Sequence, residues 1–179
     1  NVVSAPITNI PDDVSATVTL ALPGGSLSGG GVAKVGSYYQ TASTVLTGAK
    51  AGNYSFTGLT SLSANYSVTQ RALLANGITS GQSVYASALN PGTAQFSNLV
   101  SGDDVSAPVT VNTSAVSSSG HYVANTYTQT AGSALTGADK DNYTFAGGYT
   151  QQPANYTILQ KPITVASIAD SSSTYTNAL

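Results

Sequence analysis

The stretch LTGAKAGNYSF at residues 46–56 decides how this chain is interpreted, because it returns as LTGADKDNYTF at residues 135–145. Other blocks keep nearly the same spacing. ANYSV at 64–68 returns as ANYTI at 154–158, and DDVSA at 12–16 returns at 103–107. Ordered blocks that return together indicate an internal repeat with a period of about 90 residues.

The phase of the repeat divides the chain into three parts. Residues 1–70 are predicted to be a first repeat that lacks its opening strands, and residues 71–160 a complete second repeat. Residues 161–179 are predicted to be the opening strands of a third repeat, since YASAL at 85–89 is matched by the Tyr and Ala-Leu of YTNAL at 175–179. In a second interpretation, this last segment is donated to a neighbouring chain and adds strands to its sheet.

The residue pattern within each repeat is typical of β-strands. The apolar residues Val14, Ala16, Val18, Leu20 and Leu22 alternate with Ser15, Thr17, Thr19 and Ala21. In the second copy Val105, Ala107, Val109 and Val111 repeat the alternation. Pro108 in the second copy indicates an edge strand or a bulge. Gly- and Pro-rich turns divide each period into seven or eight short strands. The sequence therefore predicts an all-β fold of tandem β-sandwich repeats, Ig-like or Greek-key, rather than a β-helix with its shorter period of about 20 residues.

The composition excludes several classes of partner. Charged residues make up 7% of the 179-residue chain, against roughly 25% in ordinary soluble domains, and the net charge is -2. Such a chain offers no basic face for nucleic acid or for an anionic membrane surface. It contains no Cys, and no segment has the ~18 consecutive apolar residues of a membrane span. A hydroxyl-rich chain of this kind is typical of exported bacterial repeat proteins, so an extracellular location is expected.

Four segments together resemble a known family. They are VSGDDV at 100–105, LTGADKDNYT at 135–144, NYTI at 155–158 and KPITV at 161–165. In this order they resemble the YDG and MBG repeats of large bacterial adhesins of the filamentous-haemagglutinin type, which leave the cell by two-partner secretion. The chain departs from that pattern at residues 84–87, which read VYAS instead of VYDG. The resemblance implies export, a place on the cell surface or in the biofilm matrix, and a role as a stalk or adhesive array.

The sequence predicts no catalytic residue and no cofactor. His121 is the only histidine, and neither Cys nor Glu is present, so a catalytic triad or a zinc site would depend on this one imidazole. The corresponding part of the first copy, near residues 29–31, has no histidine. His121 is therefore interpreted as a strand residue, and the chain as a non-enzyme.

A calcium site is the alternative considered for DKDN at 139–142, with Asp103 and Asp104 as further oxygen ligands. The same part of the first copy reads AKAG, at residues 49–52. Since this part of the first copy contains no carboxylate, the segment at 139–142 is interpreted as a solvated turn. No metal site is predicted.

The tripeptide Asn-x-Ser/Thr, the acceptor pattern for N-glycosylation, occurs five times. The asparagines are Asn53, Asn65, Asn112, Asn142 and Asn155. Their repeated placement also fits a structural role, in which Asn closes a turn and the next Tyr enters a strand. Both interpretations stay open.

The function predicted first is structural: a stalk or adhesive segment of a secreted bacterial surface protein. Its expected partners are neighbouring repeats or other copies of the chain, and host-surface or matrix carbohydrate or protein. The alternative is an extracellular fibre subunit that polymerises by donating its terminal strands. A carbohydrate-binding module is disfavoured, because the chain has no Trp and only three Phe for an aromatic platform.

Overall fold

The computed structural model describes residues 3–6, 10–173 and 175. This described part is all-β, with fifteen strands and two short 3-10 helices, Ala51–Asn53 and Lys140–Asn142. The predicted all-β class is therefore confirmed. None of the helices among the described residues has the length and hydrophobicity needed to cross a membrane.

The N-terminal region, residues 3–70, is organised around the long strand β3 (Gly36–Thr47). β3 pairs antiparallel with β2 (Ser15–Ala21), β4 (Leu59–Thr60) and β5 (Tyr66–Val68), and β1 (Val3–Pro6) pairs with the outer edge of β2. Val14, Ala16 and Val18 are buried, whereas Ser15 and Thr17 between them are partly exposed. The predicted alternation is confirmed from Val14 to Val18, but Leu22, predicted to be on the buried face, follows the strand and is 43% exposed.

The central region, residues 71–160, contains ten short strands instead of the predicted seven or eight. They are β6 (Arg71–Ala72), β7 (Ala75–Ile78), β8 (Gly81–Val84), β9 (Ala94–Phe96), β10 (Val109–Val111), β11 (Thr126–Tyr127), β12 (Gln129–Ala131), β13 (Tyr143–Thr144), β14 (Tyr149–Thr150) and β15 (Tyr156–Leu159). The number is higher partly because β11 and β12, separated by Thr128, pair with different neighbours. β10 lies at the edge of the sheet β10-β12-β14 and begins directly after Pro108, as predicted.

Two parallel pairings join the beginning of the central region to its end. β6 pairs with β13, and β8 pairs with β15 over four residues, so β15 lies between β11 and β8. The strand order therefore depends on residues more than 70 positions apart. Residues 71–84 thus supply the strands β6 and β8, which pair with β13 and β15 near the end of the region.

Two hydrophobic clusters form the core of the central region. In the larger cluster Leu73 and Ile78 pack with Ala131 and Phe145, and Phe145 meets Phe96 edge-to-face at 5.1 Å between ring centroids. The smaller cluster contains Tyr127, Tyr156 and Ile158. Burying each large side chain stabilises the fold by roughly 1.5–3 kcal/mol, so these clusters hold the short strands together.

Several contacts occur once in each region. Tyr54 donates its hydroxyl hydrogen bond to Asp12, and Tyr143 donates to Asp103. Gln40 Nε2 donates to Asn65 Oδ1, and Gln129 Nε2 donates to Asn155 Oδ1. Each residue of the first region and its equivalent in the second lie 89 to 91 positions apart, which matches the spacing of the sequence blocks.

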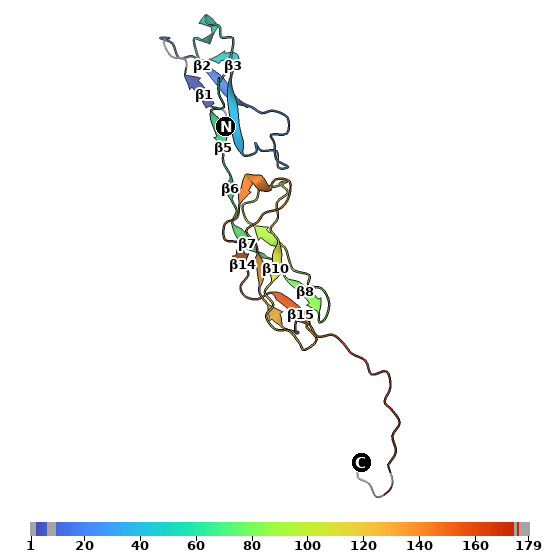
Figure 1. The fold of residues 1–179 in the computed structure, drawn as a ribbon. Helices are drawn as coiled ribbons and strands as arrows, with labels where there is room; N and C mark the ends of the chain where they lie inside the picture. Colours follow the sequence, from blue (N-terminus) through green and yellow to red (C-terminus); the bar gives the residue numbers. More distant parts are fainter. Residues whose placement is uncertain (1–2, 7–9, 174, 176–179) are drawn as a thin grey trace.

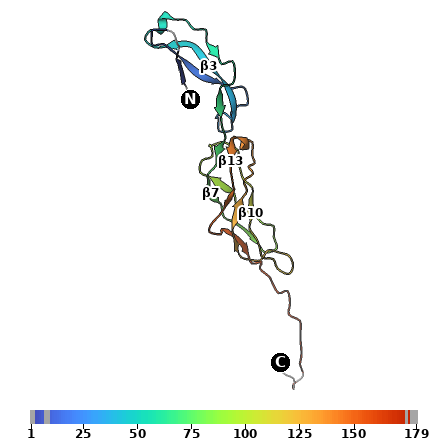
Figure 2. The same cartoon turned by 60° about the vertical axis from the view of Figure 1, so that its left-hand side comes forward.

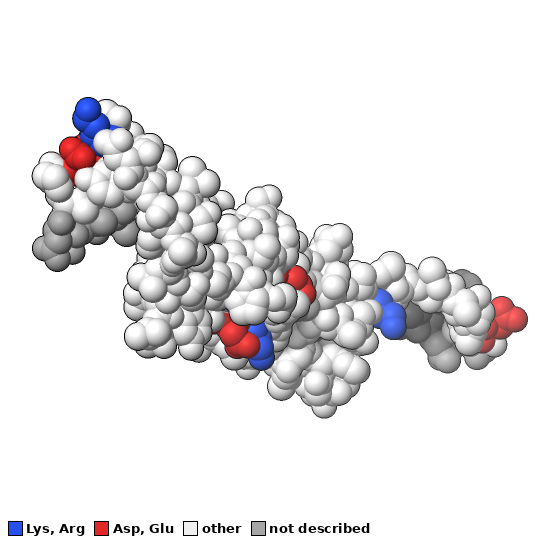
Figure 3. All heavy atoms as spheres, turned by 90° about the horizontal axis from the view of Figure 1, so that it is seen from above, with Lys and Arg blue, Asp and Glu red and all other residues white. Residues whose placement is uncertain are grey.

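The two regions lie end to end and the tail, residues 161–173, leads away from the far end of the central region (Figures 1 and 2). No strand is formed in the tail. Figure 3 shows charged side chains only as isolated groups on an otherwise uncharged surface. The described part of the molecule is thus elongated. The face shown in Figure 3 carries few charges.

Candidate functional site

A loop of the N-terminal region, residues 28–35, is hydrogen-bonded to the central region and forms a joint between the two. The backbone N–H of Gly29 donates to Asp139 Oδ2 at 3.2 Å, and that of Gly30 donates to Asp103 Oδ1 at 2.7 Å. The N–H of Val35 donates to Asn142 Oδ1 at 2.9 Å. Three side chains of one region thus accept hydrogen bonds from consecutive parts of a single loop of the other.

The two glycines allow the backbones to approach closely. A Cβ atom on Gly29 would lie 2.4 Å from the carbonyl oxygen of Gly102, and one on Gly30 would lie 2.7 Å from that of Ser101. Both contacts are with backbone, which cannot rotate away as a side chain can. Any larger residue at these positions would push the two regions apart.

The Asp103 carboxylate is the electrostatic centre of the joint. It accepts the Gly30 N–H and the Tyr143 hydroxyl. Burial alone would raise the pKa of Asp103, but the Ser28 and Tyr143 hydroxyls, the Gly30 N–H and the charge of Lys34 together lower it below its usual value. Burial and the hydrogen bond to Asp103 raise the pKa of the Tyr143 hydroxyl. The site therefore favours an ionised Asp103 beside a neutral Tyr143.

The prediction of a solvated turn at residues 139–142 is wrong for Asp139, which is only 4% exposed. Its Oδ2 accepts the N–H groups of Gly29 and Asp104, at 3.2 Å and 3.0 Å. Burial of a carboxylate requires such partners. In the first copy the matching position is occupied by Lys50.

The carboxylates of the joint are engaged with N–H and O–H donors. The described residues contain no group of three or more acidic or histidine side chains placed to hold a metal ion. Asp141, a further member of the calcium alternative, is exposed. The chemistry available here is the attachment of two protein segments to each other.

The joint also contains a partly apolar cavity and the short chain segment that connects β5 to β6. Val32, Val68, Val100 and Asn142 line a cavity of about 280 Å³ between the regions. β5 continues directly into β6 through residues 69–70, and Gln70 Nε2 donates to the carbonyl oxygen of Asp141 at 3.0 Å. The short connection is thus itself attached to the central region.

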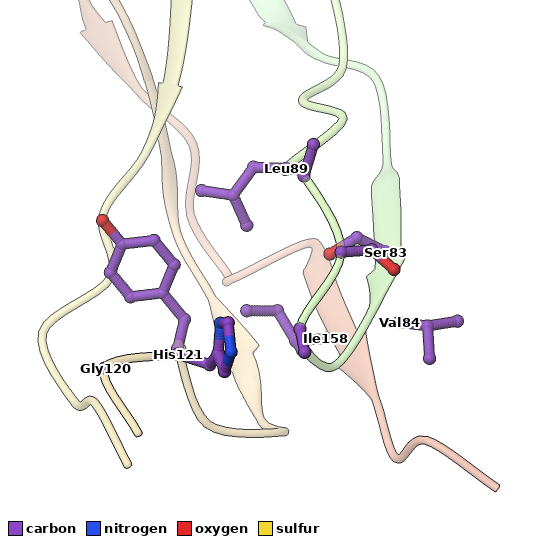
Figure 4. A pocket seen from close by; sticks show the side chains of 10 residues that line it. Ser83, Val84, Leu89, Gly120, His121 and Ile158 are labelled. Atoms are coloured by element: carbon purple, nitrogen blue, oxygen red, sulfur yellow. The ribbon is translucent and has the colours of Figure 1, made fainter. Parts of the chain in front are cut away.

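His121 lies at the opposite end of the central region, beside a cavity of about 170 Å³ (Figure 4). Its ring is exposed and stacks edge-on against Tyr85, with 5.7 Å between the centroids. The hydrogen bonds that the Tyr85 hydroxyl makes with Ser117 and Ser119 lower its pKa. The described residues that line the cavity include no carboxylate, and its volume is below the 300–1,000 Å³ typical of ligand pockets.

The five asparagines of the glycosylation pattern differ in their exposure and in whether the side-chain nitrogen Nδ2 donates a hydrogen bond. Nδ2 of Asn155 donates to the carbonyl oxygen of Ile78 at 2.7 Å, and Nδ2 of Asn112 donates to two threonine hydroxyls. Asn142 is half-buried in the joint, whereas Asn53 and Asn65 are exposed. Asn53 and Asn65 therefore offer the most accessible acceptor nitrogens.

Comparisons with known proteins identify no relative. The chain matches no protein-family model, no curated protein and no solved structure.

The joint was not recognised in the sequence, where the glycines at 29–31 indicate only a turn. A signal was nevertheless present. Ser118 and Ser119 replace Gly29 and Gly30 in the second copy, and Asp139 replaces Lys50. These differences lie on the two surfaces that meet at the joint.

Proposed function

We propose that this chain is a structural segment of an exported bacterial surface protein, built from tandem β-sandwich repeats of about 90 residues. It acts as a stalk or as part of an adhesive array, with residues 1–70 and 71–160 as successive repeats. The observation that carries this proposal is the joint at Gly29 and Gly30, where backbone and carboxylates hold two successive regions end to end. A stalk needs such joints, because a flexible connection would collapse the array.

The nearly neutral surface supports the same role. Arrays with few charges repel each other little, so weak contacts with other copies, or with matrix carbohydrate or protein, accumulate through multivalency and depend little on salt. The resemblance to YDG and MBG repeats supports an extracellular location on the cell surface or in a biofilm matrix. In this proposal the chain carries out no catalysis, inserts into no membrane and binds no nucleic acid.

Small-angle X-ray scattering of the Gly29→Ala variant tests the joint. The added methyl group meets the Gly102 carbonyl, so the variant should show a broader range of inter-region angles than the wild type. Gly24→Ala is the matched control, because a Cβ there meets nothing within 4 Å. Equal flexibility of wild type and Gly29→Ala would overturn the proposed role of the joint.

The fibre subunit is the second candidate function, and one observation favours it. The tail presents Ile163, Val165 and Ile168 to solvent, with exposed fractions of 89%, 78% and 88%. A row of exposed apolar side chains is typical of a segment that is buried in a larger assembly.

A further inference from the structure

A groove runs over the sheet of the N-terminal region. It is lined by Val18, Gln40, Ala42, Leu59, Ser61 and Asn65, and its volume is about 200 Å³. Leu59 is 63% exposed, and Gln40 and Ala42 are half-buried. Apolar side chains and two amide groups thus meet in an open depression beside β3.

The matching place in the central region is filled by β7 and the residues after it. Ile78 is 5% exposed and packs in the cluster that contains Ala131, the counterpart of Ala42. The Ile78 N–H donates to Gln151 Oε1 at 2.9 Å, and its carbonyl oxygen accepts from Asn155 Nδ2 at 2.7 Å. The next carbonyl, that of Thr79, accepts from Gln129 Nε2 at 3.1 Å.

The N-terminal groove carries the same pair of amides. Gln40 Nε2 lies 3.2 Å from Asn65 Oδ1, as Gln129 Nε2 lies 2.7 Å from Asn155 Oδ1. In the central region this pair binds the backbone of residues 78 and 79. The groove therefore presents hydrogen-bond groups suited to an extended backbone, beside an apolar depression suited to an isoleucine.

The tail carries the residues that would fill it. Ile163 and Ile168 follow Leu73 and Ile78 by 90 positions. Leu73 and Ile78 are 6% and 5% exposed, whereas Ile163 and Ile168 are 89% and 88% exposed. The same apolar spacing is thus buried in one segment and exposed in the other.

We infer that this groove is a binding site for residues 161–173 of a second copy of the chain. Ile168 then occupies the place of Ile78, and the Ile168 and Ala169 carbonyls accept from Asn65 and Gln40. Ser171–Ser173 pair in parallel with β5, as Gly81, Gln82 and Ser83 pair with β15. Among the described strands β5 pairs only with β3, so its other edge is available.

The geometry favours a second copy over the chain's own tail. The tail leaves β15 at the end of the central region opposite to the groove and leads away from it (Figure 1). Contacts between such copies are head-to-tail, with a groove at one end and a donor at the other. A head-to-tail contact that does not close into a ring produces filaments.

This inference rests on the equivalence of the two regions that also underlies the proposed function, but it concerns other residues than the joint. Sedimentation velocity of the 179-residue chain over a wide concentration range tests it. The wild type should associate, and Ile168→Asp should lower the association constant at least tenfold. The control is Thr164→Asp, because the matching residue Leu74 is 60% exposed and the position faces outward.

A cross-link tests the register independently of any change in fold. The chain has no cysteine, so Asn65→Cys and Ile168→Cys variants can be mixed and oxidised. A disulfide-linked heterodimer is expected, and little should form when Lys50→Cys replaces Asn65→Cys. Monomers at every concentration without the cross-link, or association unchanged in Ile168→Asp, would overturn the inference. Neither result would bear on the Gly29 joint.

Discussion

The N-terminal and central regions share many contacts but differ in how completely their cores are covered. Tyr156 and Gln129 are fully buried, whereas their counterparts Tyr66 and Gln40 are only half-buried. The difference follows from residues 71–84, whose strands β6 to β8 cover the central sheets and have no equivalent among the described residues of the N-terminal region. A repeat of this kind depends for its stability on its opening strands, and the two regions should have unequal stability.

The largest expected effect comes from the buried tyrosine. Tyr156→Ala should destabilise the central region by about 3–5 kcal/mol, because it removes a fully buried ring. The hydroxyl that accepts the Asn90 N–H is lost with it. Tyr66→Ala should cost the N-terminal region about 1–2 kcal/mol, since its ring is already partly solvated. Urea unfolding followed region by region with pulsed hydrogen exchange measures both, and equal losses would contradict the comparison.

Substitution of the equivalent glutamines Gln129 and Gln40 should give a smaller difference in stability between the two regions. Gln129→Ala leaves the Gly92 N–H, the Thr79 carbonyl and Asn155 Oδ1 without their partner in a buried site, and should cost about 2–3 kcal/mol. Gln40→Ala should cost about 0.5–1 kcal/mol. Thermal unfolding monitored by circular dichroism checks the difference. A Gln40→Ala variant as unstable as Gln129→Ala would mean that the groove is already occupied.

Acid should weaken the joint, because protonation of Asp103 removes its charge. The pKa of Asp103 is lower in the folded chain than its ordinary value near 3.9. Its contribution is thus fully present above that ordinary value and is lost as the pH falls through the lowered folded value. Small-angle scattering between pH 7 and pH 2 should show the inter-region motion increase in this window. Asp103→Asn should be more flexible at pH 7 and should change less with pH, whereas a variant with the full wild-type acid response would contradict this role.

The smallest expected effect is a stabilisation of the central region alone. Ala86 has a φ of 67°, in the left-handed region that favours glycine, and lies in the turn closed by the hydrogen bond from the Ser87 N–H to the Val84 carbonyl. Ala86→Gly should stabilise the central region by about 1 kcal/mol and leave the N-terminal region unchanged. Ala88→Gly is the control, with no expected gain. Equal melting temperatures for wild type and Ala86→Gly would show that this turn stores no strain.

The sequence predicted the features that depend on local patterning. Alternation around Val14 to Val18 marked a strand, and Pro108 marked the edge of a sheet, because each reflects a local property of the chain. The parallel pairings of β6 with β13 and of β8 with β15 could not be predicted, since they join residues more than 70 positions apart. The joint was missed for a related reason. The sequence does not distinguish a glycine that allows two backbones to approach closely from a glycine that allows a turn. Only the neighbouring residues in the folded structure distinguish them.

Electron–electron double resonance between two spin labels measures the rigidity of the joint directly. The labels are attached to cysteines introduced at Leu62 and Ala146, both exposed and on different sides of the joint. A rigid joint should give one narrow distance distribution, which broadens when Gly29→Ala is added and not when Gly24→Ala is added. A broad distribution in the wild-type background would show that the two regions move independently and would contradict a stalk built from such joints.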